Sequence, residues 1–461
     1  MFGSRTRYPS YQLSPRTDSP SLPQEWSWRR LASLGRQVKD TGRPGLPLLS
    51  VYLGRGVIPY AEGGRRVHAP SEKLDAYQVV QAGDLVLNNQ QAWRGSVGVS
   101  HHTGIISPAY IVLRLSSDVD PRFAYFLFPS RPMVDKYVRA SRGVGDIQRD
   151  IHGPSLRSIA VPVPPLAEQV AIARYLTHAN ARIYMAIAAK RRLIALLEES
   201  DRAIANQLLA DIGPGPRKHI PWLGLVPESW NVVPAKRLFR EVDRRSPSGS
   251  EGLLSLRMRE GLVHAHEYTV SPIPPADLVG YKIVNPGEIV MNRMRASIGL
   301  FGVSPVSGLV SPDYSTMTVA EGVDPEFYLL LFKTDLAMSE FRKRSTGLGT
   351  GSSGFMRLYY EEFGTLPMPV PSLEEQRRIV VYVTGGRAKI APVIARAQRE
   401  INLLQEFRTR LVADVVTGQV DVREIAASLP EVDANTSWRD FGTAAEIEPA
   451  EFDDVIEASE G

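Results

Sequence analysis

Two stretches of this sequence, VPVPPLAEQ at residues 161–169 and MPVPSLEEQ at residues 368–376, share a run of prolines followed by Leu, Glu and Gln, 207 residues apart. Trp26 matches Trp230 at an offset of 204 residues. Three further pairs of stretches match in the same order at that offset: 75–84 with 279–288, 104–110 with 308–314, and 119–123 with 323–327. Ordered matches indicate an internal duplication, and two repeats are too few for a solenoid. We therefore predict two similar modules, each with a globular part and a helical part.

The globular parts are predicted to span residues 21–160 and 222–367. Both contain short apolar runs of β type that are separated by Gly and Pro, at residues 84–87, 109–113, 288–291 and 316–319. An Asp-Pro pair follows in each part, at Asp120-Pro121 and Asp324-Pro325. An Asp N-cap with Pro at the first helical position predicts the start of a helix. Each part is therefore expected to be an α/β (α+β) domain with an irregular, mostly antiparallel sheet.

The helical parts follow the proline-rich stretches, at residues 165–211 and 372–417. Apolar residues recur in both at steps of four, seven and three residues, which is heptad spacing with Lys190 and Asp201 as polar seam positions. The apolar residues are Ile183, Ile187, Ile194, Leu197, Ile204 and Leu208, and, 207 positions later, Ile390, Ile394, Ile401, Leu404, Leu411 and Val415. A lone helix would expose this stripe to water, so we predict that the two helices pair as a coiled coil. The alternative is that each helix folds back on its own globular domain.

The second helical part contains Gly385, Gly386 and Pro392. Proline in a helix interior costs roughly 3 kcal/mol and glycine about 1 kcal/mol relative to alanine. Ser372 and Glu375 form a capping box at the start of this helix. We therefore expect a helix that starts normally and is broken near residues 385–392.

Composition and charge narrow the class of protein. The chain lacks cysteine, which excludes disulfides and thiolate zinc sites and fits a cytoplasmic location. No stretch approaches the about 20 apolar residues that span a membrane. Residues 424–461 hold eleven acidic residues and one basic residue, so an acidic flexible tail of charge −10 is expected beside a body of +14. Residues 1–20 are expected to form a flexible, mildly basic arm. A basic body favours a polyanion partner, although a soluble protein with a solvated tail would carry the same charges.

The order domain, long helix, domain, long helix resembles the specificity subunit of type I restriction-modification systems. IPWLGLVPESW at residues 220–230 resembles the opening of a target-recognition domain in that family. Residues 163–169 and 370–376 resemble its proline-rich hinge before each spacer helix, and VTGQVD at residues 416–421 resembles the end of its second helix. The resemblance covers about residues 21 to 423 and leaves out the arm and the tail.

The resemblance implies a function for each part. Each globular domain would read one half of a bipartite, asymmetric target in double-stranded DNA. The paired helices would hold the two readers apart and dock two modification (methyltransferase) subunits, through which restriction (translocase-nuclease) subunits join. S-adenosylmethionine, ATP and Mg would belong to those partners, and this chain would be non-catalytic and without a cofactor. Helices that pair antiparallel relate the two modules by a pseudo-two-fold axis, which suits half-sites in opposite orientation.

Three kinds of segment are candidates for DNA contacts. The first is a loop rich in amides and arginine after a strand, where Asn and Gln can bind adenine and Arg can bind guanine: Asn88, Asn89, Gln90, Gln91, Trp93 and Arg94, with Asn292, Arg293 and Arg295. The second is a basic stretch suited to phosphates: Arg139 and Arg142, with Arg342, Lys343 and Arg344. The third is Arg65 and Arg66, with Arg257 and Arg259 in the second domain. An ordinary polar loop or a solvated helix end would have the same composition.

Motifs for chemistry are largely missing from the sequence. It has no Walker A motif, no Asn- or Asp-Pro-Pro-aromatic tetrapeptide, no carboxylate-x-Lys pair and no Gly-x-Ser-x-Gly. Residues 349–354, GTGSSG, fit a dinucleotide fingerprint but follow a basic helical stretch and not a strand. The eight histidines lack partners at metal spacing, so no metal site is expected. Three alternatives stay open: a methylation-only system, an enzyme with an unrecognised carboxylate site, and a coiled-coil adaptor that binds no DNA.

Overall fold

The computed structural model of the chain describes residues 6–12, 21–63, 70–71, 73–144, 148–207, 215–258, 260–268, 273–348 and 355–431. It divides into two compact units, Met1–Lys190 with Gln398–Gly461 and Arg191–Ala397. Each unit holds one globular domain and part of both long helices, so the boundary between the units crosses the helices. None of the helices in the described ranges is long and apolar enough to cross a membrane.

The first domain is built on a four-stranded antiparallel sheet of order β4-β11-β8-β9. These strands are β4 (Gly35–Gln37), β11 (Tyr110–Leu115), β8 (Leu85–Asn88) and β9 (Val97–Val99). Antiparallel pairs surround the sheet: β3 (Ser27–Arg30) with β14 (Ala160–Val163), β5 (Leu49–Tyr52) with β6 (Gly56–Pro59), β7 (Gln78–Val80) with β10 (Gly104–Ile106), and β12 (Ser141–Val144) with β13 (Gln148–Ile151). The helices are α1 (Leu31–Leu34), α2 (Pro121–Leu127), α3 (Arg131–Ala140) and α4 (Gly153–Arg157).

The second domain repeats this plan, with a four-stranded sheet of order β18-β25-β22-β23. These strands are β18 (Phe239–Val242), β25 (Tyr314–Val319), β22 (Ile289–Asn292) and β23 (Phe301–Val303). The matching pairs are β17 (Asn231–Pro234) with β28 (Pro367–Val370), β19 (Leu254–Arg257) with β20 (Gly261–His264), β21 (Lys282–Val284) with β24 (Gly308–Val310), and β26 (Thr346–Leu348) with β27 (Phe355–Arg357). The helices are α6 (Pro325–Phe332), α7 (Asp335–Arg344) and α8 (Tyr360–Gly364). The predicted fold class and duplication are confirmed.

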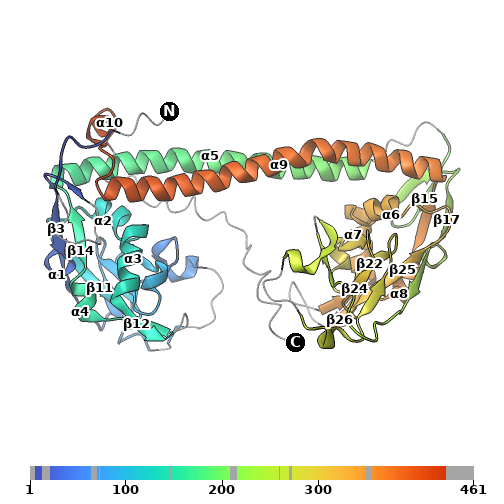
Figure 1. The fold of residues 1–461 in the computed structure, drawn as a ribbon, viewed down its shortest axis with the longest axis horizontal. Coiled ribbons are helices and arrows are strands. Elements are labelled where there is room, and N and C mark those ends of the chain that lie inside the picture. The colour runs from blue at the N-terminus through green and yellow to red at the C-terminus, as the bar shows by residue number, and fades with distance from the viewer. Residues whose placement is uncertain are drawn as a thin grey trace. The chain divides into compact units, whose positions relative to one another are not determined.

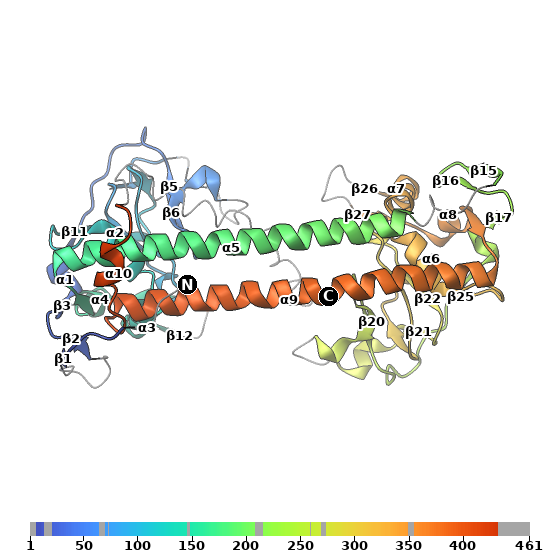
Figure 2. The ribbon, with the colours of Figure 1, turned by 90° about the horizontal axis from the view of Figure 1, so that it is seen from above.

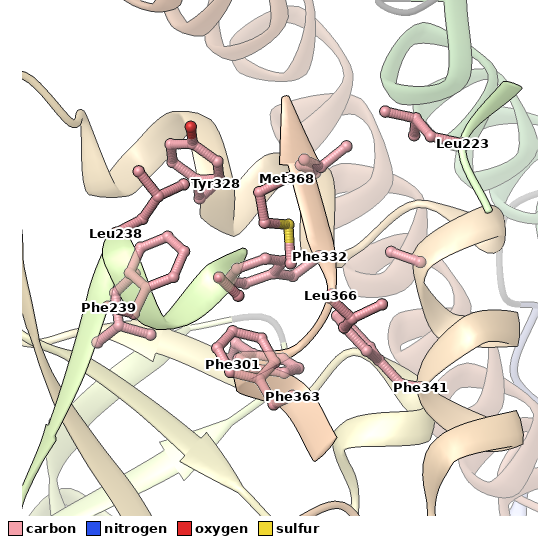
Figure 3. Close-up of a cluster of buried hydrophobic side chains, with 14 of the residues drawn as sticks. Leu223, Leu238, Phe239, Phe301, Tyr328, Phe332, Phe341, Phe363, Leu366 and Met368 are labelled. Carbon is pink, nitrogen blue, oxygen red and sulfur yellow. The ribbon is translucent and has the colours of Figure 1, made fainter. Parts of the chain in front are cut away.

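Helix starts and aromatic packing fix the domain interior. Asp120 accepts hydrogen bonds from the backbone N–H groups of Arg122 and Phe123, and Asp324 accepts one from Glu326, as the Asp-Pro pairs predicted. The second domain packs phenylalanines from its sheet against its helices (Figure 3). The cluster includes Phe239, Phe301, Phe332, Phe341 and Phe363. Phe301 and Phe332 have ring centroids 4.8 Å apart, within the range of favourable aromatic pairs.

The two long helices are α5 (Leu166–Gln207) and α9 (Leu373–Val416), and they run side by side (Figures 1 and 2). In the first unit Arg408 bonds Tyr184 and Glu400 bonds Lys190, so the residue number falls along α9 as it rises along α5. That order is antiparallel. In the second unit Arg387 Nε lies 2.9 Å from Asp201 Oδ1. The predicted pairing is confirmed, and both polar seam positions carry a partner of opposite charge, which favours one register.

The apolar residues of the paired helices are buried to different extents in the two units. In the first unit Ile183, Ile187, Ile401, Leu411 and Val415 are buried and Leu404 is half-buried. In the second unit Ile194, Leu197, Ile390 and Ile394 are half-buried. The side chain of Ile204 and residue Leu208 lie outside the described residues. The packing of the helix pair is therefore tighter beside the first domain than in the other unit.

The predicted break in the second helix is wrong, because α9 is one helix with Pro392 inside it. Pro392 and Gly385 are exposed, whereas Ile390 and Ile394 turn toward α5. The hydrogen bond that proline removes thus lies on the solvent side, where water can satisfy the freed carbonyl group. The neighbouring seam holds the helix across this point, because packing stabilises a helix more than intrinsic propensity does.

A buried glutamine, Gln169, joins the start of α5 to the first domain. Its Oε1 accepts a hydrogen bond of 2.8 Å from the backbone N–H of Asp120, and its Nε2 donates to the carbonyl groups of Asp118 and Pro164. The side chain is 1% exposed, so all three bonds are shielded from water. We call this arrangement the glutamine anchor.

The same anchor recurs at Gln376 at the start of α9. Its Oε1 accepts from the N–H of Asp324 at 2.8 Å, and its Nε2 donates to the carbonyl groups of Gly322 and Pro371. This residue is fully buried. The Glu-Gln pair that marks the repeat in the sequence therefore has a structural cause.

The predicted flexible arm is wrong for residues 6–12. In this segment β1 (Tyr11–Gln12) pairs with β2 (Leu22–Pro23). Tyr8 is buried, its ring 6.0 Å from that of Trp26, and its hydroxyl donates to Glu168 Oε1 at 2.5 Å. Burial and this carboxylate raise the pKa of Tyr8, which keeps the hydroxyl protonated and donating. Aromatic side chains thus hold a segment that its charge and prolines suggested would be loose.

The predicted flexible tail is wrong at its start. A short helix, α10 (Arg423–Ala427), follows α9, and Ala426 is buried. Arg423 bonds Asp421 and lies 4.9 Å from the centroid of the Tyr8 ring. The N–H of Asp421 donates to the carbonyl of Thr6. The arm and the end of the second helix therefore hold each other, while residues 1–5, 13–20 and 432–461 lie outside the described residues.

We predict that Tyr8 and Trp26 are coupled through Glu168. Trp26 Nε1 is buried without a hydrogen-bond partner, whereas Trp230, at the repeat position, donates to Glu375 at 3.0 Å. Tyr8→Phe should cost less than about 1 kcal/mol, because Trp26 can then donate to Glu168. Combining it with Trp26→Phe should cost about 1–3 kcal/mol more than the sum of the single changes, since a buried carboxylate loses both donors. Urea unfolding of the four proteins measures this, and additive effects would exclude the coupling.

Candidate nucleic-acid interface

Both predicted reader loops begin with the same asparagine turn at the end of a central strand. Asn88 Oδ1 accepts a 3.0 Å hydrogen bond from the N–H of Gln90, and Asn292 Oδ1 accepts from the N–H groups of Met294 and Arg295 at 3.0 and 3.1 Å. A short 3-10 helix follows in each, η2 (Ala92–Arg94) and η6 (Ala296–Ile298). These two asparagines shape the loops. Asn292 is buried and its amide oxygen is used within the turn. The predicted contacts of Asn88 and Asn292 with DNA stay predictions.

The first loop presents an aromatic ring among arginines. Trp93 Nε1 donates to the carbonyl of Gln90 at 2.9 Å, which fixes the ring across the loop. The guanidinium groups of Arg94 and Arg149 lie 4.6 and 5.2 Å from the Trp93 ring centroid, within the range of cation–π attraction. Gln90 and Arg94 are exposed, and Gln91 is half-buried. The predicted contacts of Asn89, Gln90, Gln91, Trp93 and Arg94 with DNA stay predictions.

The second loop has different side chains at matching positions. Arg293 donates to the carbonyl groups of Asp313 and Pro312 at 2.5 and 3.0 Å, so its guanidinium supports the loop. Arg295 and Met294 are exposed and face solvent. Among the predicted residues of this loop, Arg295 is thus the better placed for a ligand, and its contact with DNA stays a prediction.

Each loop lies against a hairpin that the sequence did not associate with it. The N–H of Ile151, at the end of β13, donates to the carbonyl of Asn89 at 3.1 Å. The N–H of Leu358, after β27, donates to the carbonyl of Arg293 at 2.9 Å. These contacts bring Arg149 and Arg357 to the loops. The only signal in the sequence was a basic residue after each glycine-containing stretch, and spacing could not reveal a contact between segments about 60 residues apart.

The predicted phosphate contacts fall at the ends of α3 and α7 and, for Arg142, on β12 directly after α3. Arg139 and Arg142 are exposed, and so are Arg342 and Lys343. Arg344 differs, because it is half-buried, with its Nε donating to Glu340 at 2.8 Å and its Nη1 to Thr365 at 2.9 Å. Arg344 is therefore a structural residue of the second domain, while the other four stay candidates for phosphate contacts.

Of the third predicted group, Arg257 lies within the described residues. Arg257 lies with its guanidinium 4.1 Å from the Tyr268 ring centroid and forms a 3.7 Å ion pair with Glu260. These contacts lie within the β19–β20 hairpin and the residue after the short helix η4 (Ala265–Glu267), and the predicted contact of Arg257 with DNA stays a prediction. Arg65, Arg66 and Arg259 lie outside the described residues.

The two domains differ at one buried position of strands β7 and β21, where the second domain has a lysine. Lys282 occupies the position of Gln78, and each donates a 2.8 Å hydrogen bond to a backbone carbonyl, that of Tyr314 or of Tyr110. Both residues are 4% exposed. Burial lowers the pKa of Lys282, and Asp243, 3.7 Å from its Nζ, opposes that shift. Within the described residues, no group of three or more His, Asp or Glu side chains is placed to hold a metal ion.

Lys282→Gln should raise the free energy of unfolding by up to about 1 kcal/mol at neutral pH, because a buried charge is replaced by the amide used at Gln78. The lowered pKa means that the folded protein releases this proton before the unfolded chain does. The stability of the wild type therefore rises with pH between the folded pKa and the usual value of 10.5. Urea unfolding at several pH values measures this, because the extra stability of Lys282→Gln over the wild type should decrease as the pH rises through that range. A stability difference that does not depend on pH would contradict the prediction. The converse change, Gln78→Lys, should cost about 1–3 kcal/mol, because Lys39 stands at the repeat position of Asp243.

No protein-family profile matches the chain. A curated relative, the putative type I restriction enzyme MjaX specificity subunit of Methanocaldococcus jannaschii, is 20% identical over 442 residues, which cover 88% of this chain and 96% of the relative. The resemblance to type I specificity subunits is confirmed.

A solved structure from a type I restriction-modification system shares the fold. A chain from the work on complex assembly and conformational transition of the type I restriction-modification system has a TM-score of 0.58 and 17% identity, covering 87% of this chain and 99% of that one. The HsdS subunit of Thermoanaerobacter tengcongensis, 16% identical with a TM-score of 0.45, covers 87% of this chain and 99% of its own. At such low identity the first likeness supports the arrangement of domains and helices, and individual binding residues have to be argued from this chain alone.

Proposed function

We propose that this chain is the DNA-recognition subunit of a type I restriction-modification system. Each globular domain binds one half of a split, asymmetric target in double-stranded DNA. The chain itself carries out no chemistry, and it needs no cofactor of its own. Methyl transfer from S-adenosylmethionine, and cleavage driven by ATP with Mg, take place on modification and restriction subunits in the cytoplasm.

One observation carries this proposal: the two domains share a frame and differ where a ligand would be read. Gln169 and Gln376 make the same three hydrogen bonds, while the loops after β8 and β22 differ at nearly every exposed position. Trp93 of the first loop, for example, stands at the repeat position of Ser297. An adaptor that binds one protein partner twice would have no reason to vary the exposed positions of these loops. Two different half-sites require such variation.

The helix pair also supports partner docking. Leu196 of α5 and Leu403 of α9 occupy the same repeat position, and they are 53% and 63% exposed. Large apolar residues on the outer faces of paired helices contribute nothing to the seam, and they favour an interface with another protein. Duplicated surfaces of this kind suit two copies of one partner, which we propose are the methyltransferase subunits.

The proposal is tested by mapping methylated bases across a host genome with and without this gene, while the partner genes stay expressed. Methylation should disappear at one split, asymmetric motif when the gene is deleted. If no motif changes, the recognition role is wrong and an adaptor or an unrecognised enzyme becomes the better hypothesis. If the motif is lost but the host shows no restriction of unmethylated phage DNA, the system is methylation-only.

The docking surface predicts a second result. Leu196→Glu combined with Leu403→Glu should weaken binding of the methyltransferase subunit about tenfold or more, because two charges enter an apolar interface. Isothermal titration of the purified chain with that subunit measures the loss. Glu199→Gln with Glu406→Gln, at another exposed pair of repeat positions, provides the matched control and should leave binding unchanged. Equal affinity of both double variants would place docking elsewhere.

A further inference from the structure

The hairpins β12–β13 and β26–β27 are each joined to a reader loop by a backbone hydrogen bond. The hydrogen bonds from Ile151 N to Asn89 O and from Leu358 N to Arg293 O join equivalent positions of the two domains. Their lengths are 3.1 and 2.9 Å. A contact made by backbone groups does not depend on the side chains beside it. Each hairpin can therefore carry different side chains and keep its place at the loop.

In the first domain the hairpin brings Arg149 and Asp150 to the loop. The Arg149 guanidinium lies 5.2 Å from the Trp93 ring centroid, and Asp150 Oδ1 accepts a 3.3 Å hydrogen bond from Asn89 Nδ2. Arg149 is half-buried, with the flat face of an aromatic ring as its support. A guanidinium held in this way loses less side-chain entropy when it binds a planar ligand.

In the second domain the arginine has moved by one position. Arg357 matches Asp150, and Met356 matches Arg149. Arg357 Nη1 lies 3.6 Å from Asp313 Oδ1, and its Nη2 lies 3.9 Å from the Met294 sulfur. The guanidinium is again partly exposed and supported by a loop residue. Because neighbouring residues of a strand point to opposite sides, the two arginines approach their loops differently.

We propose that Arg149 and Arg357 are specificity-determining residues, each of which binds a guanine in the half-site that its domain reads. This inference rests on the proposed function and extends its site from the loops to the hairpins. Arginine binds the O6 and N7 atoms of guanine with two parallel hydrogen bonds. Each arginine here is oriented by its neighbours before the ligand arrives, as a reader of base edges requires.

The charges around both arginines favour a base over a phosphate. Asp150 follows Arg149 in the chain and bonds the same loop, and Asp313 lies beside Arg357. The carboxylate beside Arg357, 3.6 Å from its Nη1, repels a phosphate and leaves a neutral base edge as the better ligand, and the Asp150 carboxylate on the first loop acts in the same direction. The predicted phosphate contacts lie on other elements: Arg139 on α3, Arg142 on β12, and Arg342 and Lys343 on α7.

The test is a methylation map of hosts that carry the complete system with Arg149→Ala or Arg357→Ala. Arg149→Ala should reduce methylation about tenfold or more at sites with a guanine at one position of one half-site, and should admit other bases there. Arg357→Ala should do the same in the other half-site only. In each variant the unaffected half-site reports that the chain is folded and assembled.

Matched controls come from the repeat. Arg36 of β4 and Arg240 of β18 occupy equivalent positions, and both are exposed on their domains away from the hairpins. Arg36→Ala and Arg240→Ala should leave the motif and its methylation unchanged. Arg149→Lys and Arg357→Lys keep the charge but cannot form the bidentate pair, so they should also relax the guanine position.

The outcomes separate the two proposals. A wild-type chain that directs no split motif would contradict the proposed function. A wild-type motif that stays intact in both alanine variants would overturn the inference and leave the proposed function standing. Uniform loss of methylation at all sites, rescued by lysine, would assign the arginines to phosphate and would also overturn it.

Discussion

The structure depends on the glutamine anchor at the start of each long helix. Gln169 and Gln376 each bond one N–H and two carbonyl groups from separate parts of the chain, in places closed to water. A buried amide left without these partners would cost free energy comparable to several lost hydrogen bonds. The anchor therefore fixes where a spacer helix leaves its domain. If the helices set the distance between two half-site readers, as proposed, each helix has to leave its domain at a fixed place.

The sequence predicted the duplication, the helix starts and the helix pairing because each of them leaves a local motif or a periodic pattern. Ordered matches at offsets of 204 and 207 residues gave the duplication, Asp120 and Asp324 gave helix starts, and the heptad stripe gave the pairing. It failed where a long-range contact overrides local preference. The seam carries α9 through Pro392, and Tyr8 docks on Trp26 and Glu168 although its neighbours are arginine, serine and proline. Propensity within a short window contains no information about either partner.

The sequence could predict the loops of the candidate site, but it could not predict the hairpins that lie against them. A stretch of Asn, Gln and Arg after a strand can be found by composition, and the loops do follow β8 and β22. Composition could not separate residues that shape the loop from residues available to a ligand. Asn292 and Arg293 turned inward to bond the backbone, and Arg344 bonded Glu340 and Thr365. Nor could it reveal that Arg149 meets Trp93, since only the fold brings these two segments together.

The backbone hydrogen bonds and asparagine turns that help to hold each loop and hairpin in place do not involve the side chains that differ between the two domains. This separation has a physical consequence for how binding specificity could change. Ile151 and Leu358 hold the hairpins through backbone N–H groups, and the asparagine turns are made by Asn88 and Asn292. None of these bonds involves the side chains at 93 and 297 or at 149 and 356. Substitution at those positions therefore alters the exposed chemistry of one reader, and it leaves the sheet, the anchor and the helix seam untouched. Within this one chain the two domains already differ in that way, with Trp93 and Arg149 in one and Ser297 and Met356 in the other.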